Sequence, residues 1–169
     1  AGIFFIGYFL FEVPSNVLMH RIGAKKTLTR IMILWGLISA AMAMTQTATQ
    51  FYVLRFLLGA AEAGFYPGII LYLTYWFPSQ RRGQMIALFM TAVPLAGILG
   101  GPLSGWIMES FHGHSGLAGW QWMFLLEAIP SLALGLAVMW YLNDHIGDAA
   151  WLSTEEKARL TRNIEAEKR

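Results

Sequence analysis

The sequence predicts an all-helical integral membrane protein with five spanning helices. Apolar side chains make up 56% of its 169 residues and charged ones only 13%. Soluble domains carry about a quarter of their residues as charged side chains. Five long apolar segments follow one another, and the basic residues gather in alternate loops. Together these three observations favour a helical membrane protein over a soluble domain.

The apolar segments run approximately over residues 1–18, 29–45, 51–77, 84–108 and 120–142. A membrane span needs about 20 mostly apolar residues. The first segment has neither the basic start nor the small-residue cleavage site of a secretory signal peptide. We therefore expect it to be a true spanning helix whose upstream neighbours are missing from this chain.

The stretches between these segments have the composition of loops. A basic stretch, 20–30, precedes the second segment, and the polar residues 46–50 precede the third. Pro78 ends the third segment, as proline commonly does after a helix. Residues 109–119, which include glycines and histidines, separate the fourth segment from the fifth.

Basic residues mark one side of the predicted bundle. Of the 12 Lys and Arg residues, all but Arg55 lie between the first and second segments or at the very start of the second, between the third and fourth, or after the fifth. The loops 46–50 and 109–119 contain none. Because cytoplasmic loops carry an excess of Lys and Arg, we expect the basic side to be cytoplasmic.

The polar tail, residues 143–169, predicts an amphipathic helix outside the membrane. Ser153 lies three residues before Glu156, the spacing of a capping box at a helix start. Leu160 and Ile164 share one face of this helix, which is too polar to span a bilayer.

Arg55 and Glu62 are the charged residues of the third segment, and charges inside a membrane usually face a cavity or a partner. Their spacing of seven places them on one helix face, about 10 Å apart along the axis. One interpretation is functional: Arg55 holds an anion and Glu62 takes up and releases a proton. The other is a structural pair buried in the bundle.

Other polar residues give weaker signals. Tyr8 lies in mid-span, where its hydroxyl needs a partner or the ring simply packs. Glu12 either extends to the membrane interface or joins a cytoplasmic gate network, and for Glu127 a packing or gate role is favoured over contact with a substrate. His112 and His114 form a pair in a loop without the further ligands of a metal site. We therefore predict no metal and no cofactor.

The fourth segment carries a pattern of small residues. Gly97, Gly101 and Gly105 recur every fourth residue, and Pro102 lies among them. Small residues at this spacing allow helices to approach closely, and proline gives a kink. We expect these residues to serve helix packing or a hinge.

Three stretches resemble motifs of the major facilitator superfamily. Residues 16–28 resemble the signature G-x-L-a-D-r-x-G-r-k-x-x-l between its second and third helices, residues 54–67 its fourth-helix pattern, and residues 97–105 its fifth-helix pattern. In the first stretch, the positions that match the family's cytoplasmic gate motif are Arg21, Gly23, Lys25 and Lys26. His20 replaces the usual Asp, which puts the family's cytoplasmic charge lock in question.

Within that superfamily the chain resembles the anion:cation symporters, which include tartrate, phthalate and 4-hydroxyphenylacetate carriers. The resemblance implies helices two to six of the N-terminal half, followed by the start of the central cytoplasmic loop. It also implies proton-coupled symport of a small organic anion across the bacterial inner membrane. Arg55 and Tyr8 would bind the substrate and Glu62 would couple the proton. The implied partners are the anion, the proton, the bilayer, and the missing first helix and C-terminal half of the transporter, with no nucleic acid.

Three alternatives to an organic-anion symporter have to be weighed, and the sequence leaves the first two open. A carrier of another solute class would share the fold, and so could a membrane assembly subunit that transports nothing. An intramembrane enzyme would need a nucleophile with a partner at depth, but Ser39 and Ser104 have no His beside them in the segments. We therefore expect no enzymatic activity.

Overall fold

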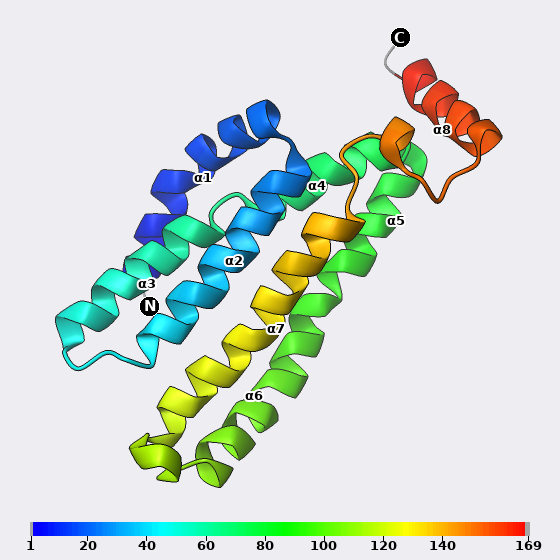
Figure 1. Ribbon diagram of the computed structural model, residues 1–169. Coiled ribbons are helices and arrows are strands. Elements are labelled where there is room, and N and C mark those ends of the chain that lie inside the picture. The colour runs from blue at the N-terminus through cyan, green and yellow to red at the C-terminus, as the bar shows by residue number, and fades with distance from the viewer. Residues whose placement is uncertain (1, 168–169) are drawn as a thin grey trace.

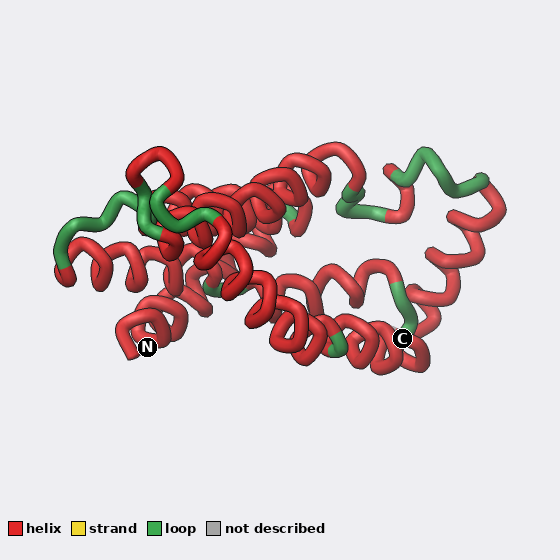
Figure 2. Tube along the Cα trace, turned by 90° about the horizontal axis from the view of Figure 1, so that it is seen from below, coloured by secondary structure: helices red, strands yellow, loops and turns green. Residues whose placement is uncertain are grey.

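A computed structural model describes residues 2–167, and the chain over this range folds into helices joined by short loops (Figure 2). Ala1, Lys168 and Arg169, which belong to the predicted first segment and tail, lie outside the described residues. The helices are α1 (Gly2–Ile22), α2 (Ala24–Met42), α3 (Ala48–Glu62), α4 (Phe65–Trp76), α5 (Ser79–Met90), α6 (Ala92–Ser110), α7 (Gly119–Tyr141) and α8 (Thr154–Glu167), with short 3₁₀ turns η1 (His114–Gly116) and η2 (Ile146–Asp148).

The chain crosses the bundle back and forth, as the alternation of basic and non-basic loops predicts. The α1–α2 turn, the α4–α5 turn and the chain after α7 all lie toward one end, which we call the basic end (Figure 1). The loop between α2 and α3 and the loop between α6 and α7 lie at the other end (Figure 1). All the loops with Lys and Arg therefore share one end.

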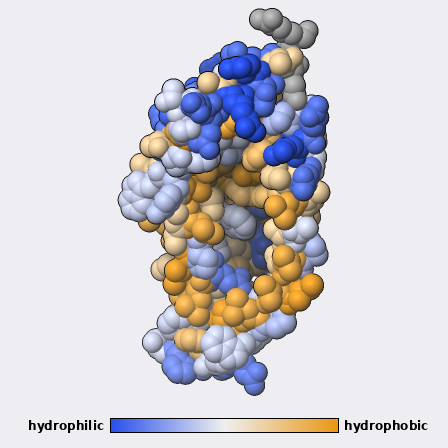
Figure 3. All heavy atoms as spheres, turned by 90° about the vertical axis from the view of Figure 1, so that its right-hand side faces the viewer, coloured by the Kyte–Doolittle hydropathy of each residue, from blue (hydrophilic) through white to orange (hydrophobic). Residues whose placement is uncertain are grey.

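Four stretches of the described chain are long and apolar enough to cross a membrane: Gly2–Ile22, Ala48–Trp76, Ser79–Ser110 and Gly119–Tyr141. The predicted second span is not one of them, because α2 begins with Lys25, Lys26 and Arg30 within its first turns. Its role as a span stays a prediction. The side view in Figure 3 shows a hydrophobic, hollowed middle between two more hydrophilic ends. Such a band suits a protein that crosses a membrane several times.

A break divides the predicted third segment into α3 and α4. Gly64 takes a left-handed backbone conformation, with φ of 87°. A Cβ there would also collide with the Ser15 side chain of α1. The fourth segment differs, because Thr91 between α5 and α6 keeps helical angles. The third segment therefore breaks immediately after Glu62, whereas the fourth continues through Thr91 with helical backbone angles.

Glycines bring pairs of helices into direct backbone contact. A Cβ on Gly7 of α1 would collide with the Phe56 carbonyl oxygen, and one on Gly59 of α3 would collide with the Phe4 carbonyl oxygen. On the other side of α2, Gly36 packs on Leu132 of α7. These close approaches hold α1 against α3, and α2 against α7.

The tail folds back on the bundle at the basic end. Trp151 stacks on Trp76 of α4, with ring centroids 5.8 Å apart and planes 12° apart. Ile146 and Ala149 are buried in the same cluster. The chain that follows α7 thereby reaches α4, and Figure 2 shows α8 at this end of the molecule. Helix α8 lies within this tail, and reciprocal hydrogen bonds between Ser153 and Glu156 precede and begin it.

Candidate functional site

Helix α3 carries both intramembrane charges of the third segment. It starts at a capping box formed by two hydrogen bonds. The Gln50 amide donates to the Thr47 hydroxyl, and the Thr47 amide donates to the Gln50 side-chain oxygen. This cap fixes the helix start and hence its register. Arg55 lies about two turns in, and Glu62 is the last helical residue. The interval of seven residues therefore lies wholly within one unbroken helix.

Both charges line one cavity of about 670 Å³. Its walls come from the start of α1, from α2 and from one face of α3, and consist mainly of aromatic side chains: Phe4, Phe5, Trp35, Phe51 and Tyr52. The cavity thus combines one cation and one carboxylate with a large apolar surface.

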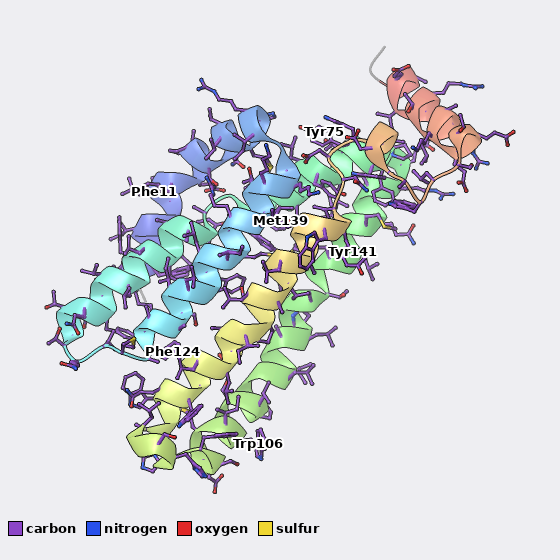
Figure 4. All side chains as sticks on the ribbon, in the orientation of Figure 1. Phe11, Tyr75, Trp106, Phe124, Met139 and Tyr141 are labelled. Atoms are coloured by element: carbon purple, nitrogen blue, oxygen red, sulfur yellow. The ribbon has the colours of Figure 1, made fainter. Side chains whose placement is uncertain are left out.

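The Arg55 guanidinium lies against aromatic faces. Its Cζ atom is 5.1 Å from the Phe51 ring centroid and 6.0 Å from that of Phe124 on α7. Figure 4 shows Phe124 far from Tyr75, on the side of the molecule opposite to the basic end. Among the described residues, the contacts of the Arg55 guanidinium are with these two rings, and it makes no hydrogen bond or ion pair. Aromatic faces favour a cation without using its N–H donors, so these donors are free for a ligand.

Glu62 lies deeper along α3, next to the helix break. Its side chain is partly buried, and no described Lys or Arg pairs with it. The interval to Arg55 is too long for a direct ion pair in the described chain. The two charges are therefore separate groups on one wall rather than a structural salt bridge.

Tyr8 lies beside this site without being a clear part of its wall. Its hydroxyl is within electrostatic range of Glu12 and Glu62, and its ring is 6.3 Å from that of Phe4. Phe4 itself lines the cavity. A substrate contact by Tyr8 stays a prediction.

The predicted gate motif forms a tight turn at the basic end. Gly23 has φ of 90° and is the N-cap residue of α2. The Lys25 amide donates a hydrogen bond of 2.8 Å to the Asp144 carboxylate. Arg21 and Lys26 are exposed. Asp144, which follows α7, thus supplies an acidic contact to the turn in which His20 replaces the family's Asp.

Sequence reasoning did not identify Asp144. Its only signal was that of an acidic residue placed just after the fifth apolar segment. The contact joins positions 119 residues apart, and no local pattern encodes such a pairing.

The glycines of α6 have no neighbour in the described chain. A Cβ on Gly97, Gly101 or Gly105 would meet no atom within 4 Å among residues 2–167. Pro102 lies inside α6. The expected close packing of this stripe therefore does not occur within this part of the molecule, and its role as a hinge or interface stays a prediction.

The loop histidines have structural roles. The Gly119 amide donates to His112 Nδ1 at 3.2 Å, and the Trp122 indole donates to the His114 carbonyl oxygen at 3.0 Å. Over residues 2–167, no group of three His, Cys, Asp or Glu side chains could hold a metal ion.

The sequence matches the Major Facilitator Superfamily over residues 1–167. Among its relatives is the "Putative tartrate transporter" of Agrobacterium vitis, 57% identical over 167 residues, which cover 99% of this chain and 37% of that protein. The "Putative metabolite transport protein NicT" of Pseudomonas putida is 56% identical over 167 residues, with 99% and 38% covered. The "Quinolone resistance transporter" of Acinetobacter baumannii is 46% identical over 164 residues, with 97% and 38% covered. The chain therefore spans well under half the length of these relatives.

Proposed function

The chain belongs to the major facilitator superfamily, and from this premise we propose that it forms part of a transporter that moves a small organic anion together with protons. The main support for this proposal is that Arg55 and Glu62 line one cavity without pairing with each other. A carboxylate substrate fits the cation, and a proton fits the carboxylate.

Arg55 is suited to hold the anion. A guanidinium offers five N–H donors in a planar fork that matches a carboxylate. Its two aromatic neighbours leave that fork open to the cavity. In a low-dielectric surrounding, such a charge-assisted pair is stronger than in water.

Glu62 is suited to carry the proton. It lies on the same wall, farther along α3, and no described cation holds it ionised. It is also the last residue of α3, before the break at Ala63 and Gly64. Protonation or deprotonation of Glu62 would therefore take place next to the break, where α3 and α4 can change their relative direction.

The transport cycle we propose is alternating access. In this superfamily, two halves rock around a site near the middle of the membrane. The basic end faces the cytoplasm of a bacterial inner membrane in this proposal, as the positive-inside rule favours. The relatives named as tartrate and metabolite transporters support a small-molecule substrate.

Export of an aromatic acid is a second candidate function. One relative is named a quinolone resistance transporter, and the cavity wall is rich in aromatic side chains. A flat aromatic carboxylate would use both the aromatic wall and Arg55. The same site would then serve export rather than uptake.

Reconstituted liposomes test the proposal. The full gene product is reconstituted, an inward proton gradient is imposed, and uptake of tartrate, phthalate and 4-hydroxyphenylacetate is measured with and without an uncoupler. We expect one acid to accumulate and the uncoupler to abolish the accumulation. Outward movement of a quinolone under the same gradient would favour the second candidate. Movement of no acid in either direction would contradict the organic-anion proposal.

A further inference from the structure

A groove of about 480 Å³ lies between α1, α2 and α3, and we call it the outer groove. Its wall on α3 is formed by Leu57, Ala60 and Ala61. Arg55 and Glu62 of the same helix line the cavity described above. At about 3.6 residues per turn, these two sets of residues lie on opposite faces of α3. The thickness of the helix therefore separates the outer groove from the candidate transport site.

The wall of the outer groove is apolar and open to the outside. Ser15 and Arg30 are its polar residues, and every other residue that lines it is apolar. Phe11, Leu34 and Leu57, one from each helix, are 40–45% exposed. Figure 4 shows Phe11 on α1, at the side of the molecule away from α6 and α7. Since α1 and α3 belong to stretches that can cross a membrane, this exposed apolar surface is suited to a hydrocarbon chain.

The two polar residues of the outer groove meet each other. The Arg30 Nη2 donates a hydrogen bond of 3.2 Å to the Ser15 hydroxyl. Among the described residues this is the guanidinium's one hydrogen bond, and it makes no ion pair there. None of its other nitrogens is a buried atom without a partner. The remaining N–H donors of Arg30 are therefore both unused and accessible.

Ser15 fixes the position of Arg30 without neutralising its charge. The Ser15 side chain is buried, and its hydroxyl oxygen occupies the space that a Cβ on Gly64 would need. A neutral hydroxyl supplies no counter-charge, and no acidic residue lines the outer groove. Charged residues among apolar helices usually have a partner. Arg30 thus lacks a counter-ion in the described chain.

The charge lies at one end of the outer groove and the apolar wall at the other. Arg30 is about two turns from the start of α2, at the basic end, and Leu34 follows one turn deeper. Arg21, three residues after Leu18 on α1, and Lys26, four residues before Arg30, are exposed nearer that end. Residues three or four apart lie on the same side of a helix. Cations above an apolar groove match the order of headgroup and chains in one leaflet.

We propose that the outer groove binds an anionic phospholipid of the leaflet at the basic end. The lipid phosphate pairs with the free N–H donors of Arg30, whose planar fork can bond two oxygens. One acyl chain lies along Leu34 and Leu57. Arg21 and Lys26 attract a headgroup of net negative charge and repel the quaternary ammonium of phosphatidylcholine. The lipid and the transported anion occupy opposite faces of α3.

Native mass spectrometry of the full gene product in detergent tests this proposal. The delipidated protein is titrated separately with dioleoyl phosphatidylglycerol, dioleoyl phosphatidylcholine and glycerol 3-phosphate, and the bound species are resolved by mass. We expect a saturable first adduct of phosphatidylglycerol, with an affinity about fivefold or more above that of phosphatidylcholine. Glycerol 3-phosphate is expected not to bind, because it has no chain for the apolar wall.

Arg30→Gln is expected to weaken phosphatidylglycerol binding roughly tenfold, the effect of losing one strong charge-assisted pair. Arg81→Gln is the matched control, because Arg81 is an exposed basic residue at the same end and does not line the outer groove. We expect it to leave the affinity within about twofold.

Ala61→Leu tests the apolar half of the site without changing a charge, and it keeps the proposal testable should Arg30→Gln fold poorly. The larger side chain fills part of the outer groove, so we expect a loss of affinity for phosphatidylglycerol. Ala133→Leu is the same change at an exposed position of α7 outside the outer groove. This control is expected to retain the affinity.

Equal affinity for the two phospholipids, or equal losses in the Arg30 and Arg81 variants, would overturn the anionic headgroup at Arg30. Binding of glycerol 3-phosphate with the same dependence on Arg30 would overturn the phospholipid as the occupant. Unchanged affinity in Ala61→Leu, or the absence of any saturable adduct, would also contradict the proposal. Because every readout is lipid binding without the transported acid, failure here is distinct from failure of the transport proposal.

Discussion

At the scale of single residues, Arg55 has an unusual surrounding for a charge within an apolar segment. Two aromatic faces stabilise it while its N–H donors stay available to the cavity. A structural arginine at such depth would be expected to pair with a carboxylate or with carbonyl oxygens. Its open donors are the reason for assigning it to the substrate.

Replacement of Arg55 tests this assignment. Arg55→Gln is expected to weaken binding of the accumulated acid at least tenfold, because a buried charge-assisted pair is lost. Arg55→Lys keeps the charge but lacks the planar fork, so we expect its affinity for the acid to lie between those of the unchanged protein and Arg55→Gln. Trp35 on the cavity wall offers a fluorescence signal for the titration. Unchanged affinity in Arg55→Gln, with Arg81→Gln as control, would make Arg55 structural.

At the scale of elements, the crossing of α1 and α3 fixes the geometry of the cavity. Gly7 and Gly59 let the two backbones touch, so that the start of α1 forms the wall opposite to α3. A side chain at either position would push the helices apart. The cavity thus depends on two glycines that touch no substrate in this account.

Gly59→Ala is expected to destabilise the protein by about 1–3 kcal/mol, because the added Cβ overpacks a backbone contact that cannot yield. Gly83→Ala is the matched control, since a Cβ there meets no atom within 4 Å in the described chain. In a helix that control change is neutral or stabilising. Thermal unfolding of the gene product in detergent measures both. Equal melting temperatures for the two variants would rule out the tight crossing.

The start of α8 supplies a pH-dependent contact outside the membrane. Hydrogen bonds from the Ser153 amide and hydroxyl lower the pKa of Glu156 below its ordinary value of 4.5. A carboxyl group whose pKa is lower in the folded state stabilises that state above its unfolded pKa, and the contribution is lost as the pH falls through the folded pKa.

We therefore expect the amides at the start of α8 to be well protected from hydrogen exchange at pH 7 and less protected near pH 4, after correction for the intrinsic exchange rate. Glu156→Gln is expected to remove most of this pH dependence, since it deletes the carboxylate that the Ser153 amide and hydroxyl stabilise. Glu155→Gln is the control, because Glu155 has no part in that box. A pH dependence that survives in Glu156→Gln would contradict this role of the cap.

At the scale of the whole molecule, composition and charge placement predicted the helical class and the shared basic end. These features are properties of the sequence alone: apolar length sets the segments, and Lys and Arg set the sides. The break after Glu62 was not predicted, although Gly64 stood in the sequence. A glycine within a segment permits a break, but the close approach of Ser15 of α1, which leaves no room for a side chain at this position, involves a residue far away in the sequence.

The candidate site likewise combines features that the local sequence predicts with features that only the folded structure reveals. Arg55 and Glu62 could be singled out because charges in apolar segments are rare, and their spacing gave the shared face. The aromatic neighbours on other helices, such as Trp35 and Phe124, could not be found, because each lies far away in the sequence. Asp144 and the outer groove beside Arg30 escaped for this reason as well. Local patterns identify the charges, whereas the folded bundle determines what surrounds them.

Transport by a Glu62→Gln variant tests the central claim most directly. Reconstituted protein is assayed both for uncoupler-sensitive accumulation of its acid and for exchange of that acid between equal pools on the two sides. We expect the variant to lose accumulation and to retain exchange, because Arg55 still binds the anion while the proton carrier is gone. Glu127→Gln, the same change at a carboxylate outside this cavity, is expected to keep both activities. Proton-driven accumulation that persists in Glu62→Gln would contradict the account.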